Sequence, residues 1–183
     1  METSASGSYP LEEKRWGLSL EGGLNYARLQ AGPDRAQSYG FEAGAGMWLR
    51  FTPAFKSRVS LLFDYQSLQG EPFQRMARDP NPALLSMGIR TGFIFSPQDW
   101  LDVGVNIAGG TSTFSGMAGS GAYAEGGLLA CLLNDRLCLE GGLRAYGFIY
   151  ETSPESSPTY PFPHTALSQG FAWMLRASSY WDL

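Results

Sequence analysis

The strongest constraint on the fold is a period-two alternation of small or apolar residues with polar ones over residues 122–150, interrupted once at Asn134 and Asp135. An Asn-Asp dipeptide readily adopts the positive φ of a tight two-residue turn, so the stretch is predicted to fold as a β-hairpin. In the register set by that turn, one face is apolar or small throughout, and the other places Glu125 opposite Arg144. The hairpin has an apolar face and a polar face, and the fold depends on which of them is inside.

The same alternation recurs along most of the chain. Strands are predicted at residues 16–27, 39–51, 58–66, 85–95, 101–107, 122–133, 136–150 and 167–176. Connections are predicted at 31–38, 53–57, 70–82, 96–99, 109–120 and 151–163, long after the odd-numbered strands and short after the even-numbered ones. Strands of about 10 to 15 residues are long enough to cross a bilayer when tilted, and alternating long and short connections are typical of outer-membrane barrels.

The composition favours a barrel whose strands face lipid. The chain has 23 glycines and 14% aromatic residues, and its 16% charged residues lie below the roughly 25% usual in soluble domains. Mean hydropathy is nevertheless slightly negative, because apolar and polar residues alternate. The longest continuous apolar run, residues 128–133, is far short of the roughly 20 residues of a spanning helix, which excludes transmembrane helices.

Charge and the N-terminal sequence limit the partners and the location. The formal net charge is −4 and the pI is about 5.0, with no Lys/Arg cluster of the kind that follows phosphates, so nucleic acid is not expected. Residues 1–14 are predicted to be a flexible periplasmic segment before a barrel over residues 15–183. They lack the basic and then apolar start of a signal peptide, so we interpret the sequence as a mature form with an added methionine, a cytoplasmic product being the alternative.

We expect the apolar face outside and the charged face in the lumen. An eight-stranded barrel has an interior just wide enough for side chains, too small for all the Trp, Phe, Tyr and Leu residues of the apolar faces. Acids and arginines can instead pair inside it and plug the lumen, and Glu125 with Arg144 is the best supported pair. The predicted lumen charge network comprises Glu21, Glu42, Arg50, Arg58, Asp64, Arg90, Asp102, Glu125, Glu140, Arg144 and Arg176.

Aromatic residues near the strand ends are predicted to lie at the two membrane interfaces. Those expected near the periplasmic rim are Trp16, Phe51, Phe95, Trp100 and Trp181, and those expected near the outer rim are Tyr26, Tyr39 and Tyr65. The alternative is a soluble lipocalin-like barrel with the same strand number, but that class fills its cavity with apolar residues rather than arginines.

Over residues 15–181 the chain resembles the small eight-stranded outer-membrane barrels of the OmpA and OmpX type, in architecture rather than in a signature motif. The resemblance implies an all-β, antiparallel, up-and-down transmembrane β-barrel in the bacterial outer membrane, with both termini in the periplasm. It also implies outer-membrane lipids, including lipopolysaccharide, as partners, and leaves room for a protein partner at the loops or on the periplasmic side. Mature chains of that family usually end on an aromatic residue, whereas here Asp182 and Leu183 follow Trp181.

Cys131 and Cys138 are the only cysteines, and the hairpin register places them opposite each other on the polar face. The periplasm would oxidise such a pair, so a disulfide is predicted, with two buried free thiols as the alternative. Their spacing is not a metal-ligand signature and no histidine cluster accompanies them, so no metal or other cofactor is expected.

His164, the sole histidine, precedes Ser168 by four residues, so a lipid-cleaving Ser/His site has to be considered. His164 lies in the proline-rich connection and nothing nearby orients it, so we interpret it as a surface residue and expect no enzymatic activity.

The function expected from these patterns is a structural, adhesive or assembly-anchoring role in the outer membrane, with interactions through long external loops. A narrow low-conductance channel, a lipid-modifying enzyme and a soluble ligand-binding barrel are the alternatives. The external loops are predicted to expose the aromatic residues Phe73, Phe114, Tyr160 and Phe162. These side chains would either contact a partner or lipopolysaccharide, or pack within their own loops.

Overall fold

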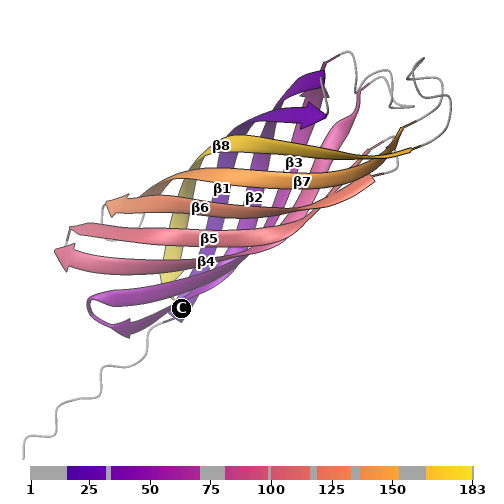
Figure 1. The fold of residues 1–183 in the computed structure, drawn as a ribbon. Coiled ribbons are helices and arrows are strands. Elements are labelled where there is room, and N and C mark those ends of the chain that lie inside the picture. The colour runs from indigo at the N-terminus through magenta and orange to yellow at the C-terminus, as the bar shows by residue number, and fades with distance from the viewer. Residues whose placement is uncertain are drawn as a thin grey trace, which may run out of the picture.

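Antiparallel strands close into a barrel in the computed structural model (Figure 1). The structure describes residues 16–31, 34–70, 81–98, 100–115, 119–132, 137–152 and 164–182. Within these residues the strands are β1 (Trp16–Ala31), β2 (Asp34–Thr52), β3 (Phe55–Gln69), β4 (Ala83–Gln98), β5 (Leu101–Phe114), β6 (Gly119–Leu132), β7 (Leu137–Thr152) and β8 (His164–Asp182). Each strand pairs with the next, and β8 pairs with β1. The predicted eight-stranded antiparallel barrel is confirmed.

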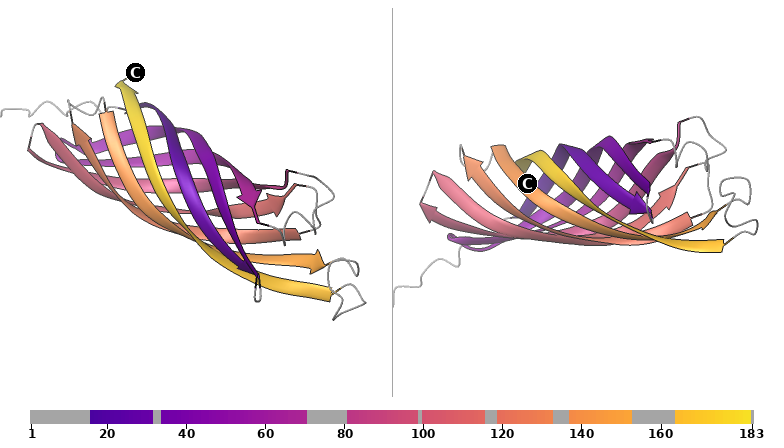
Figure 2. Two further views of the ribbon diagram at one scale, coloured as in Figure 1. Left: turned by 90° about the horizontal axis from the view of Figure 1, so that it is seen from above. Right: turned by 45° about the horizontal axis from the view of Figure 1, so that its top comes forward.

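The two ends of the barrel are distinguished by the chain path. β1 begins and β8 ends at the same end, where Gly17 pairs with Asp182, and we call this the turn end. The opposite end, where β1 is followed by β2 and β3 by β4, is called the loop end. Figure 2 shows the strands running obliquely from one end to the other. None of the described residues forms a helix long and apolar enough to cross a membrane.

The β6–β7 hairpin has the predicted register. Glu125 pairs with Arg144 and Cys131 with Cys138, and the correspondence holds along both strands. A slip of one residue would turn every apolar side chain of the hairpin from one face to the other, so the alternation fixes the register strongly. This part of the prediction is confirmed, and the turn residues 133–136 lie outside the described residues.

The predicted connections at 31–38 and 109–120 are too long, although a connection does lie within each range. Residues 34–38 belong to β2, residues 109–114 to β5 and residues 119–120 to β6. Pairing with a neighbouring strand outweighs the weak β propensity of the glycine, serine and polar residues in these stretches. Long intervals therefore remain only after β3, which ends at Gln69, and after β7, which ends at Thr152. His164, expected in a connection, begins β8 and pairs with Thr152.

Buried apolar residues form two clusters inside the barrel. The loop-end cluster comprises Ala27, Leu29, Ala36, Leu68, Leu84, Phe114, Tyr123, Tyr146, Phe148, Ala172 and Met174. The turn-end cluster comprises Trp48, Ile94, Leu129, Cys131, Cys138 and Tyr180. Gly88 and Gly110 leave room for Tyr123 in the lumen, because a Cβ on either residue would overlap the Tyr123 side chain. Most of the inward charged residues lie between these clusters, so the interior has three layers, but Lys56 and Asp102 lie beside Ile94 and Cys131 of the turn-end cluster.

Candidate functional site

The charged lumen is the candidate functional site, because burying this many ionised groups is costly unless each is paired. Strand alternation turns all eleven predicted network residues to the inner side. Ten of them are buried, and Arg50, beside the ring of Trp48, is half-buried.

Two glutamates hold three arginines together at the centre of the lumen. Glu42 pairs with Arg90 (Nη2 to Oε1, 2.7 Å), with Arg144 and with Arg176. Glu125 accepts hydrogen bonds from the Nη2 atoms of Arg144 and Arg176, each at 2.8 Å, and lies 3.2 Å from Arg90. The predicted Glu125–Arg144 pair is thus one edge of a larger network that spans the lumen.

Toward the turn end the network continues through Arg58. Its Nη1 atom donates to Glu140 Oε1 at 2.7 Å and to the Tyr180 hydroxyl at 2.6 Å, and its Nη2 atom donates to Asn106 Oδ1 at 3.0 Å. Glu140 also accepts hydrogen bonds from Asn106 and from the hydroxyl of Ser178. Charge-assisted bonds of this kind are about twice as strong as neutral ones, and here they link four strands.

Toward the loop end the network meets aromatic side chains. Arg144 Nη1 donates to Asp64 Oδ2 at 2.8 Å, and the Arg144 guanidinium carbon lies 4.1 Å from the ring centroid of Tyr123. Gln66 links Asp64 to the Tyr146 hydroxyl, which begins the loop-end cluster. The charged residues are therefore in direct contact with the aromatic residues of the loop-end cluster.

The charges of the described lumen balance. The inward carboxylates are Glu21, Glu42, Asp64, Asp102, Glu125 and Glu140, and the inward cations are Arg50, Lys56, Arg58, Arg90, Arg144 and Arg176. With six of each sign the layer is neutral, which reduces the electrostatic cost of burying it.

Sequence reasoning missed Lys56, whose Nζ atom lies 2.7 Å from Asp102 Oδ2. The prediction placed residue 56 in a turn at 53–57, whereas β3 begins at Phe55 and Lys56 points inward. Lys56 and Arg58 are two residues apart on β3, so their side chains share the inner face. Extending the predicted alternation of this strand by two residues toward the N-terminus would have identified Lys56.

The lumen near the turn end is packed. A hollow of about 10 Å³ lies among Trp48, Lys56, Ile94 and Tyr180, roughly the size needed for a single water molecule. Cys131 and Cys138 are joined by a disulfide in the same turn-end cluster. No group of three or more His, Cys, Asp or Glu side chains suited to a metal ion occurs within the described ranges.

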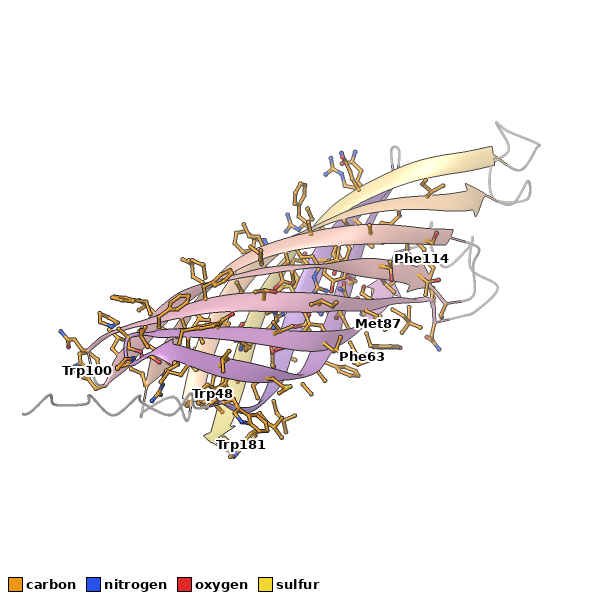
Figure 3. The ribbon with its side chains drawn as sticks, turned by 90° about the horizontal axis from the view of Figure 1, so that it is seen from below. Trp48, Phe63, Met87, Trp100, Phe114 and Trp181 are labelled. Atoms are coloured by element: carbon orange, nitrogen blue, oxygen red, sulfur yellow. A yellow bond between two sulfur atoms is a disulfide. The ribbon has the colours of Figure 1, made fainter. Side chains whose placement is uncertain are left out.

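The predicted interfacial aromatics lie on the outer surface. Tyr26 is half-buried, and the exposed members are Trp16, Tyr39, Phe51, Tyr65, Phe95, Trp100 and Trp181. Figure 3 places Trp100 and Trp181 toward one end of the barrel and Phe114 toward the other.

The expectation that Phe114 is an exposed loop residue is wrong. Phe114 ends β5, is buried in the loop-end cluster and packs against Phe148 with ring centroids 5.0 Å apart. Phe73, Tyr160 and Phe162 lie outside the described residues, as do the side chains of His164 and Ser168.

Comparison with known proteins defines the class of fold. No protein-family model matches the chain, and no curated protein sequence does. The structure is similar to that of OprG from Pseudomonas aeruginosa (TM-score 0.53, 7% identity, 92% of this chain and 97% of that one). It is also similar to Ail, the attachment invasion locus protein of Yersinia pestis, in complex with a heparin analogue (TM-score 0.50, 12% identity, 92% and 99%). A third similar structure is the Neisserial surface protein NspA (TM-score 0.50, 12% identity, 87% and 96%). The chain has the fold of the small eight-stranded outer-membrane β-barrels.

Proposed function

We propose that this protein is a closed outer-membrane barrel with an anchoring or adhesive role, and neither a conduit nor an enzyme. The observation that carries the proposal is the charge-balanced ion network of the lumen, which is buried except for the half-buried Arg50 and has an apolar cluster at each end. An open channel requires water-filled space along its axis, whereas here arginines and carboxylates from the opposite strands β3 and β7 meet at hydrogen-bond distance, as Arg58 with Glu140 and Arg144 with Asp64 do.

The outer surface supports insertion into a bilayer. Leu24, Leu61 and Ile107 are more than half exposed, as are many other large apolar side chains along the wall. A contiguous exposed apolar surface of this extent is incompatible with a monomer in water, and lipid is the environment that satisfies it. The disulfide supports an oxidising compartment such as the periplasm.

Lipopolysaccharide is the partner we propose for the β1–β2 hairpin. Arg28 and Arg35 are exposed on its outer face, beyond Tyr26 and Tyr39, whose tilted rings are in contact. The Arg28 Nε atom donates to the Tyr26 hydroxyl at 3.0 Å, so the cation lies next to an interfacial aromatic. Phosphate groups of outer-leaflet lipid lie at the level where cations beyond an aromatic girdle are expected.

The proposal is tested by export and conductance. The chain, carrying a signal peptide in a Gram-negative host, is expected in the outer membrane as a species whose gel mobility changes on boiling. Purified into a planar bilayer, it is expected to give no steady single-channel current. Recovery without detergent would contradict insertion, and a steady current from the unmodified chain would contradict the closed lumen.

A further inference from the structure

An apolar groove crosses the outer wall of the barrel over β2–β6. Its volume is about 590 Å³, within the range of about 300–1,000 Å³ typical of small-molecule sites. Phe63 and Met87, which Figure 3 labels, line it and are each more than half exposed. The groove therefore opens to the surroundings of the barrel rather than to its lumen.

Strand register explains the shape of the groove. Tyr65, Leu85 and Thr113 form one outward row of partners across β3–β5. A second row runs parallel to it through Phe63, Met87 and Thr111, two residues further along each strand, so the rows lie about 7 Å apart.

The floor of the groove lies between these rows. Asp64, Ser86 and Ser112 are the intervening residues, and their side chains are buried in the lumen. They present only backbone to the outside. The outward side chains of β3 and β4 are bulky, whereas that of Thr111 on β5 is short. The outer surface is therefore lower at Thr111, and a groove remains.

The dimensions and the chemistry of the groove suit one extended hydrocarbon chain. Five neighbouring strands span about 19 Å, and one leaflet of a bilayer core is about 15 Å thick, the length that an acyl chain covers. The lining is almost wholly apolar, with the hydroxyls of Thr113 and Ser120 at the loop end. A second copy of the barrel would bring a convex wall, which touches the rims of a groove and leaves its floor empty.

We propose that this groove binds one acyl chain of lipopolysaccharide, an inference that rests on the outer-membrane location proposed above. Tyr65, in the first row, stacks on Phe41 (centroids 5.5 Å apart), and Phe41 follows Tyr39 on the outer face of β2. This aromatic path joins the groove to Arg28, and Arg35 is exposed on the same outer face of β2 as Tyr39. The charge of these two arginines complements the phosphates of the same lipid.

The test compares two substitutions of the same kind. Thr111→Phe places a ring in the groove, whereas Thr91→Phe, opposite Val59 and Ile107, adds the same ring to the outer wall elsewhere. Each refolded barrel is mixed with purified lipid A in detergent and examined by native mass spectrometry. The unmodified chain and Thr91→Phe are expected to retain one lipid A, and Thr111→Phe to retain it about tenfold more weakly, as loss of burial for roughly two methylene groups would produce.

Three results would overturn the inference: equal retention by all three chains, retention by none of them, or a dimer of the unmodified chain that Thr111→Phe dissociates. Gel mobility with and without boiling is measured on the same samples. If all three chains show the heat-dependent shift, a negative result concerns the groove alone. If the unmodified chain shows no shift, the proposed membrane insertion itself has failed.

Discussion

The middle of the barrel and its loop end have opposite polarity along the same strand. In the middle of β1, Leu20 and Leu24 point outward and Glu21 points inward. Beyond Tyr26 the order reverses, with Arg28 exposed and Leu29 buried. The same reversal occurs on β3, where Leu61 is exposed and Asp64 buried in the middle, whereas Leu68 is buried and Gln69 exposed near the end.

This difference shows that alternation defines two faces but not the medium that each face meets. Where lipid lies outside, the apolar face is outermost and charges must pair in the lumen. Where water lies outside, an apolar interior and a polar surface are favoured, as in soluble sheets. On the proposed membrane insertion, the reversal beyond Tyr26 and Tyr65 is expected at the membrane boundary, with the end of the β1–β2 hairpin past it.

The largest effect is expected from the middle of the lumen. Arg144→Met removes a cation that contacts Glu42, Asp64 and Glu125. Arg90 and Arg176 still pair with the two glutamates, but the buried Asp64 loses its ion pair and the lumen gains an uncompensated negative charge. The free energy of unfolding should fall by about 3–5 kcal/mol, measured by urea denaturation in phospholipid vesicles. The control is Arg28→Met at the loop end, where the cation is exposed and no measurable change is expected. Equal losses of stability in the two variants would contradict the assignment of Arg144 to the buried lumen and of Arg28 to the exposed outer face.

An arginine introduced on the outer face should reveal which part of that face meets lipid. Leu61→Arg lies midway between the two aromatic girdles and should cost about 2–4 kcal/mol. Gln69→Arg, on the outer face of the same strand beyond Tyr65, should cost about 0–1 kcal/mol. The same vesicle titration measures both. A cost at Gln69 as large as that at Leu61 would place the membrane boundary elsewhere.

The smallest effects are expected from exchanging polarity at the loop end. Leu29→Gln buries an amide in the loop-end cluster and should cost about 1–3 kcal/mol. Gln30→Leu, its outward neighbour, should change stability by no more than about 0.5 kcal/mol. Thermal unfolding followed by circular dichroism compares them. If Gln30→Leu were the more damaging variant, the hairpin would have its faces the other way round.

The sequence predicted which side chains share a face of a strand better than it predicted where the strands begin and end. The Asn-Asp turn and the alternation together identified the β6–β7 register, and alternation grouped Arg58 and Arg90 with the other charged residues on one face, because period two is a local property. It missed the strand content of residues 34–38 and 109–114, where hydrogen bonding to a neighbouring strand decides the conformation.

Apart from Glu125 with Arg144, which acid meets which arginine was also beyond the sequence. Glu42 on β2 meets Arg144 on β7, and the length and tilt of the strands set which side chains face each other across the lumen. Lys56 was missed for a different reason, since the turn was predicted too long. The reversal of polarity at Leu29 and Leu68 was visible in the sequence, but its meaning required knowing that β1 and β3 extend so far.

Accessibility of spin labels along β3 tests the central claim most directly. The native cysteines are joined to each other, so a nitroxide attached through Leu61→Cys or Gln69→Cys reports one position only. In phospholipid vesicles, the label at position 61 should collide with oxygen, which partitions into lipid, and that at position 69 with a water-soluble nickel chelate. Strong collision with the nickel chelate at both positions would contradict the account, because it would place the middle of the outer wall in water.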